Sequence, residues 1–151
     1  MALFECSIDL AHPPERVFDF LIRPASILKT LPPDSGLTYT SFPEVLEAGS
    51  RVEIKVERYT MVHHAVHEVS VFEWPLRFTE RQVEGPLGAY EHEHVLSPST
   101  AGTLLVDRIQ FEPPGGLAGF LITESVIRQE FEKGFQHRHQ ELQRLLAAEA
   151  G

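Results

Sequence analysis

Residues 103–116, TLLVDRIQFEPPGG, contain the point at which the chain changes its structural period. Up to Phe111 the side chains alternate between two faces, which is typical of a β-strand. The Pro-Pro-Gly-Gly sequence then ends the strand. From Leu117 to about Ala148 apolar residues recur mostly at steps of three, four or seven, which predicts one long helix. Its apolar stripe comprises Phe120, Ile127, Phe131, Phe135, Leu142, Leu145 and Leu146.

Before this point the chain is strand-like from Gly36 onward. Short turn sequences separate most of the runs, which favours an antiparallel meander. The turn near residues 59–61 is the weakest of these boundaries. The six predicted strands are LTYTSF (37–42), SRVEIKVERY (50–59), VHHAVHEVSVFE (62–73), RFTERQVE (77–84), AYEHEHVL (89–96) and TLLVDRIQF (103–111).

The N-terminal segment adds one strand and two short helices. Residues 3–10, LFECSIDL, alternate between apolar and polar side chains and predict a half-buried strand. Residues 11–33 have helical spacing that Pro24 interrupts and Pro32–Pro33 end. We therefore expect a single domain of the α+β class over residues 1–151, with a seven-stranded antiparallel sheet and a long C-terminal helix on one face.

The composition excludes several classes of function. The net charge of −9, from 13 basic and 22 acidic residues, disfavours binding to nucleic acid and to anionic membranes. Cys6 is the single cysteine, so neither an intramolecular disulfide nor a cysteine-rich zinc site can form. No apolar run approaches the length of a membrane span, and the first residues do not resemble a signal peptide. We expect a cytoplasmic protein without stable membrane insertion.

Four segments resemble the START-like, polyketide cyclase/dehydrase-like (SRPBCC) helix-grip superfamily, and in particular a bacterial subgroup of ligand-binding proteins. The resemblance extends over essentially the whole chain. It implies a curved sheet wrapped round the long helix, with the two short helices closing one end of a cavity. It also implies a hydrophobic small-molecule ligand, since members carry lipids, bind hormones or secondary metabolites, or catalyse cyclisation and dehydration. The segments are FECSIDLAHPPERVFDFL (4–21), RFTERQVEGPLGAYEHEHVL (77–96), VDRIQFEPPGGLAG (106–119) and FEKGFQHRHQEL (131–142).

The run AYEHEHVL places two kinds of chemistry on opposite faces of one strand. Tyr90, His92, His94 and Leu96 share one face, and the two glutamates share the other. Because Tyr90 and Leu96 are large, we expect the histidines to point inward. By the same alternation Phe78, Glu80 and Gln82 point inward from the preceding strand and Asp107 from the following one. The predicted ligand contacts are Phe78, Glu80, Gln82, Tyr90, His92, His94, Asp107, Phe131 and Phe135.

This polar group leaves three interpretations open. The side chains fix the polar end of a ligand, or His92 and His94 move protons with Glu80 or Asp107, or the group only hydrogen-bonds to itself. No bound metal and no cofactor are expected. His-x-His lacks the acidic residue that follows it in cupins, which leaves Glu80 as the candidate for a third metal ligand.

The other histidines are not assigned to the site. Periodicity does not decide whether the face of His63 and His67 or that of His64 is the inner one. His137 and His139, beside Arg138 in FQHRHQEL, are interpreted as part of a solvated helix face.

Three functions therefore remain. The first is a carrier or sensor of a hydrophobic or amphipathic small molecule. The second is a cyclase or dehydratase acting on a polyketide-like or aromatic substrate. The third is a structural or interaction protein whose interior is filled by its own side chains. The sequence leaves the ligand's identity and the oligomeric state open.

Overall fold

A computed structural model describes residues 1–58 and 61–150. Within this part of the chain the strands form one antiparallel sheet in the order β1-β7-β6-β5-β4-β3-β2. The order confirms the predicted meander, with the N-terminal strand added beside the last one. The strands are β1 (Ala2–Leu10), β2 (Leu37–Ser41), β3 (Arg51–Arg58), β4 (Met61–Glu73), β5 (Arg77–Glu84), β6 (Ala89–Pro98) and β7 (Thr103–Glu112). The weak boundary near residues 59–61 falls largely on residues 59 and 60, outside the described residues.

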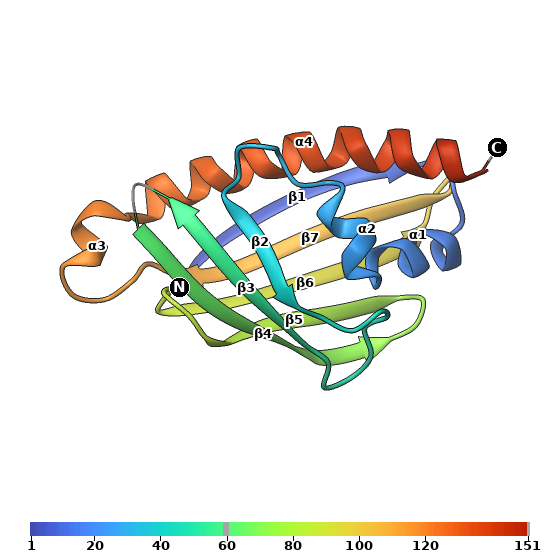
Figure 1. Ribbon diagram of the computed structural model, residues 1–151. Coiled ribbons are helices and arrows are strands. Elements are labelled where there is room, and N and C mark those ends of the chain that lie inside the picture. The colour runs from blue at the N-terminus through green and yellow to red at the C-terminus, as the bar shows by residue number, and fades with distance from the viewer. Residues whose placement is uncertain (59–60, 151) are drawn as a thin grey trace.

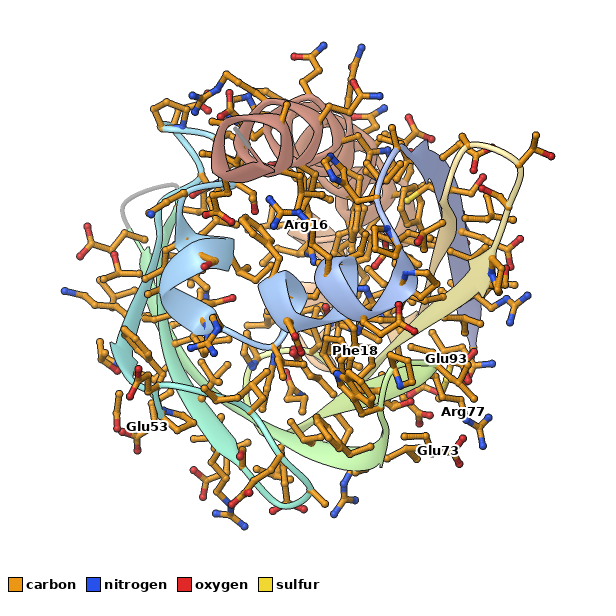
Figure 2. The ribbon with its side chains drawn as sticks, turned by 90° about the vertical axis from the view of Figure 1, so that its right-hand side faces the viewer. Arg16, Phe18, Glu53, Glu73, Arg77 and Glu93 are labelled. Carbon is orange, nitrogen blue, oxygen red and sulfur yellow. The ribbon has the colours of Figure 1, made fainter. Side chains whose placement is uncertain are left out.

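Two short helices follow β1, as predicted: α1 (Pro14–Leu21) and α2 (Pro24–Leu28). They lie across one end of the space between the sheet and the C-terminal helix (Figures 1 and 2). The Arg16 guanidinium of α1 donates to the carbonyl oxygen of Leu146 in that helix at 2.8 Å. Phe18 packs edge-on against Phe78 of β5, with ring centroids 5.3 Å apart. The short helices therefore join both layers and close that end.

The predicted long helix is divided into α3 (Ala118–Leu121) and α4 (Glu124–Ala150). Ile122 has φ −105° and ψ 82°, which is not helical. The hydroxyl of Thr123 then accepts the backbone N–H of Val126 at 3.3 Å, as a side chain at a helix start does. The prediction of one helix from Leu117 is wrong for this reason, and Phe120 is 80% exposed instead of joining the apolar stripe.

Helix α4 lies along the concave face of the curved sheet (Figure 1). Near α1 the space between them is filled by Leu142 and Leu146 of α4 with Leu10, Leu96 and Leu105 of the sheet. Toward the other end a second cluster joins Phe135 and Ile127 to Phe4, Ile109 and Phe111. No helix among the described residues combines the length and the apolar character needed to cross a membrane.

Candidate functional site

The inner faces of β5, β6 and β7 place a band of polar side chains side by side in the middle of the sheet. The strand register pairs Glu80 with His92, Phe78 with His94, and His94 with Asp107. Directly opposed residues point to the same face of a sheet. The predicted group of acidic and histidine side chains therefore lies together on the inner face.

His92 and Asp107 form a buried hydrogen bond at the centre of this band. Their Nε2 and Oδ1 atoms are 2.7 Å apart, and the two residues are 4% and 0% exposed. Burial alone would raise the pKa of Asp107. The imidazoles of His139 and His92 more than offset this effect, so the pKa of Asp107 lies well below its ordinary value. The carboxylate is therefore ionised and accepts the Nε2 proton of His92.

His94 lies under this pair, in an apolar setting. Its Nδ1 donates to the carbonyl oxygen of Phe78 at 3.2 Å, and its ring stacks on the Phe78 ring with centroids 4.0 Å apart. Burial lowers the pKa of His94 well below its usual value. The imidazole is therefore neutral, and its Nδ1–H is engaged with the backbone.

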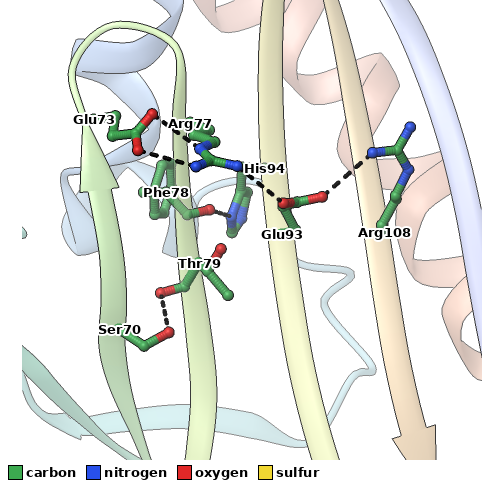
Figure 3. A network of polar contacts seen from close by, with 8 residues as sticks. All are labelled: Ser70, Glu73, Arg77, Phe78, Thr79, Glu93, His94 and Arg108. Atoms are coloured by element: carbon green, nitrogen blue, oxygen red, sulfur yellow. Dashed lines mark hydrogen bonds and ion pairs between the residues drawn. The ribbon is translucent and has the colours of Figure 1, made fainter. Parts of the chain in front are cut away.

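The glutamates of AYEHEHVL belong to the opposite face, as predicted. Figure 3 shows Glu93 between Arg77 and Arg108 on the outer side of the sheet, and His94 on the inner side. Glu93 is 3.3 Å from Arg108 and 4.0 Å from Arg77, and Arg77 also pairs with Glu73. These pairs tie four neighbouring strands together, from β4 to β7, and take no part in the interior chemistry.

The nine predicted ligand contacts divide into two layers. Five are almost completely covered by other side chains, and four keep part of their surface accessible. The covered layer has little surface to offer a ligand, whereas the accessible layer keeps such surface. The covered residues are Phe78, His92, His94, Asp107 and Phe135, and the accessible ones are Glu80, Gln82, Tyr90 and Phe131.

Tyr90 connects the two layers. Its hydroxyl lies 3.4 Å from Nδ1 of His92, and its ring stacks on His67 of β4 with centroids 4.8 Å apart. Burial raises the pKa of Tyr90 above its ordinary value, so the phenol keeps its proton and serves as a donor. The result is a hydrogen-bonded series from Tyr90 through His92 to Asp107, which leads from accessible surface to a buried carboxylate.

Glu80 and Gln82 have different roles although they share a face of β5. The Gln82 amide donates to the carbonyl oxygen of Leu87 at 2.8 Å and accepts the N–H of Leu87, so it holds the β5–β6 turn. Glu80 has no such internal bond among the described residues. Its pKa is raised, chiefly because it lies deep between the sheet and α4.

The structure decides which face of β4 is the inner one. Ala65 and Val69 are buried, and His67 stacks on Tyr90, so the face of His63 and His67 points inward. His64 is exposed. Burial lowers the pKa of His67 to about 4. His67 is therefore a neutral ring on the accessible wall.

Two residues of α4 belong to this interior, although the sequence analysis assigned them to a solvated face. His139 lies 4.0 Å from Asp107 and 4.0 Å from the Cys6 sulfur. Arg138 influences the pKa of Glu80 and of Asp107 on two separate strands. The signal was present, since Arg138 lies three residues after Phe135 and four before Leu142, in the apolar stripe itself.

Two groups of side chains in the described part bring donor atoms within 4.8 Å of one another: Cys6, Asp107 and His139, and His92, His94 and Asp107. Asp107, from the neighbouring strand, thus lies where a third metal ligand beside His92 and His94 would be needed. However, the 2.7 Å between His92 and Asp107 is a hydrogen-bond length, shorter than the about 3.3 Å between two ligands of a tetrahedral zinc ion. Burial also raises the pKa of Cys6 to about 12, which disfavours the thiolate that zinc needs. That the protein holds no metal stays a prediction.

A hollow of about 480 Å³ lies at the β5–β6 turn. Its walls include Arg81, Glu91 and Gln110 of the outer face, and also Gln82 and Tyr90 of the accessible layer. The hollow is open to solvent and lacks the His92–Asp107 pair. We therefore place the candidate site on the inner face.

Comparison with solved structures shows a START-like fold. TTHA0849 from Thermus thermophilus matches with a TM-score of 0.78 at 17% identity, over 99% of this chain and 100% of that one. A START superfamily protein from Mycobacterium smegmatis matches with a TM-score of 0.71 at 11% identity, over 97% of both chains. Ara h 8.0201 matches with a TM-score of 0.67 at 12% identity, over 97% and 98%. No protein-family model and no curated protein matches the sequence.

Proposed function

We propose that residues 1–151 form one ligand-binding domain that holds a hydrophobic or amphipathic small molecule between the inner face of the sheet and α4. It acts as a carrier or sensor in the cytoplasm, with no nucleic-acid partner. The strongly acidic composition supports the absence of a nucleic-acid partner. The START-like fold supports a binding role in general terms.

The observation that carries the proposal is a set of accessible side chains on a face that is otherwise covered. Tyr39, His67, Glu80, Tyr90 and Phe131 point inward from four strands and α4, yet each is only half-buried. The pKa shifts of Tyr39, His67, Glu80 and Tyr90 all have burial as their largest cause, so these groups lie deep in the molecule. Accessible surface at such depth supports the proposal of an interior space for a ligand.

Gly134 of α4 supplies a second sign of this space. A Cβ atom on Gly134 would meet no atom within 4 Å, although the residue is half-buried. It lies one turn after Glu130, which pairs with Arg58 of β3, and beside Lys133, which pairs with Asp34 at 3.3 Å. Ion pairs therefore join α4 to β3 and to the segment before β2, close to a glycine with open space beside it, which suits a route for ligand entry.

Binding accounts for the polar group better than proton transfer does. Both nitrogen atoms of His92 already have partners, in Asp107 and Tyr90. His94 is neutral, covered and bonded to the backbone. The remaining accessible groups suit the orientation of a ligand's polar end, with Phe131 against its apolar part.

The test uses Nile red, an uncharged apolar dye, with the full chain. We expect saturable binding at one site per chain. Gly134→Phe should weaken the affinity by about tenfold or more, because the ring occupies the space. His64→Phe, which adds a ring on the outer face, is the matched control and should leave the affinity unchanged. Non-saturable uptake, or equal losses in both variants, would contradict the proposal.

A further inference from the structure

Arg138 differs from the other arginines of this protein, because it forms neither a hydrogen bond nor an ion pair with any described residue. It is half-buried, and its Nε atom is buried without a partner. Its aromatic contact is the Phe135 ring on its own helix, with the guanidinium carbon 5.3 Å from the centroid. Every other arginine has a polar partner: Arg16, Arg23, Arg51, Arg58, Arg77, Arg81, Arg108, Arg128 and Arg144.

The Arg138 guanidinium lies over the ring of the buried Phe135, on the side of α4 that packs against the sheet. It influences the pKa of Tyr39 on β2, of Glu80 on β5 and of Asp107 on β7. Tyr39 and Asp107 are far apart in the sheet order, which agrees with a position of the guanidinium between α4 and the sheet. Arg138 also lies one turn after Gly134, where an added Cβ atom would meet no atom within 4 Å.

A cation in this position is unfavourable unless something compensates it. Taking a guanidinium out of water costs free energy that an ion pair or hydrogen bonds must offset. The Phe135 ring offsets only part of this cost. Asp107, the nearby ionised carboxylate, is already hydrogen-bonded to His92 and is not within ion-pair distance of Arg138.

Other donors around the same space also lack partners. The Tyr39 hydroxyl and the His67 imidazole form no hydrogen bond with the described residues. Burial raises the pKa of Tyr39 and of Glu80, which keeps the phenol protonated and favours the uncharged carboxylic acid of Glu80. The accessible wall therefore offers one cation and several donors, and burial of Glu80 favours the uncharged form, which does not neutralise them.

We propose that the molecule bound in this interior carries a carboxylate, which accepts two parallel hydrogen bonds from the Arg138 guanidinium. The proposal rests on the proposed ligand-binding function and adds the chemical class of the ligand, a hydrophobic monocarboxylic acid. The planar fork of arginine matches a carboxylate in this way. A doubly charged phosphate fits less well, because Asp107 lies nearby and a single arginine faces the space.

The experiment compares a hydrophobic acid with its uncharged primary amide. Octanoic acid and octanamide form one pair, and 1-naphthoic acid and 1-naphthamide form another, so that aliphatic and aromatic sources are tested separately. Each compound displaces Nile red from the wild-type chain, from Arg138→Gln and from Arg144→Gln. Arg144 is the matched control, since it lies on the same helix but pairs with Glu141 in solvent.

In at least one pair the wild type and Arg144→Gln should prefer the acid by about tenfold or more. Arg138→Gln should bind acid and amide equally while keeping its affinity for the amide. A wild type that binds both compounds equally overturns the carboxylate proposal and leaves ligand binding intact. A wild type that binds neither the dye nor any compound overturns both.

A second measurement needs no variant, in case Arg138→Gln does not fold. A ¹³C label on the carboxyl group of the bound acid reports its pKa by NMR. A pKa below that of the free acid supports the pairing with a cation. A pKa at or above that of the free acid overturns it.

Discussion

His92 and Asp107 are joined diagonally across two strands. His92 stands opposite Ile109 and Asp107 stands opposite His94, yet the Nε2–Oδ1 distance of 2.7 Å makes His92 the closest partner of the carboxylate. His94, directly opposite, is 3.9 Å from the same oxygen. The bond therefore runs diagonally from β6 to β7 and fixes the His92 imidazole beneath the accessible wall.

Replacing Asp107 with Asn should destabilise the fold strongly. The change replaces the ionised acceptor of a fully buried hydrogen bond, and hydrogen bonds to charged groups contribute about 1.5–3 kcal/mol. Glu93→Gln on the adjacent strand breaks exposed ion pairs and should cost about 1 kcal/mol or less. Urea denaturation at pH 7 measures both free energies of unfolding. If both variants lost a similar free energy of unfolding, the buried pair would contribute no more to stability than the exposed ion pairs.

His67 should make stability depend on pH. Its pKa is about 4 in the folded protein and about 6.5 when unfolded, so between these values only the unfolded chain takes up the proton. Stability therefore falls as pH decreases from 6.5 to 4. His67→Gln should reduce this slope, and His64→Gln, on the exposed face, should not. NMR titration of the His67 ring gives the pKa directly, and a value near 6.5 would contradict the assignment.

Glu80 should act in the opposite direction. Burial raises its pKa in the folded state, so its favourable contribution is present below pH 4.5 and is lost as pH rises through the folded value. Glu80→Gln cannot ionise and should gain stability relative to the wild type as pH rises toward 8. Glu84→Gln, an exposed change on the same strand, is the control. A difference between Glu80→Gln and the wild type that does not vary with pH would refute this account of Glu80.

Gly134→Ala should stabilise the protein by about 1 kcal/mol, the usual difference between Gly and Ala inside a helix. The new Cβ has room, because no atom lies within 4 Å of its position. Thermal and urea unfolding measure the gain. A loss of stability would show that the space beside α4 is filled, and would weaken the case for an interior site.

Alternation and helical spacing are local, and they were sufficient for the strands, the antiparallel meander from β2 to β7 and the inward direction of His92, His94 and Asp107. Local patterns did not decide the face of β4, since both faces mix histidine with small apolar residues, and the contact of His67 with Tyr90 comes from a distant strand. They also missed the break before Thr123, where one hydroxyl starts a new helix.

Arg138 shows a different limit. Its position fits the apolar stripe of α4, but a charged residue normally marks the solvent face. Only the three-dimensional arrangement reveals that this arginine points over the sheet and lacks a partner among the described residues. A charged side chain at a position where the helical pattern expects an apolar one is therefore a candidate for a functional role.

The most direct test of the central claim is a ¹H–¹³C NMR titration of the aromatic side chains with octanoic acid and, separately, with 1-naphthoic acid. Binding between the sheet and α4 should shift the resonances of Tyr39, His67, Tyr90 and Phe131, and leave that of the exposed His64 unchanged. If saturating amounts of both acids leave the inner-face resonances unchanged, or shift only those of exposed residues such as His64, the interior does not bind these ligands and the account is wrong.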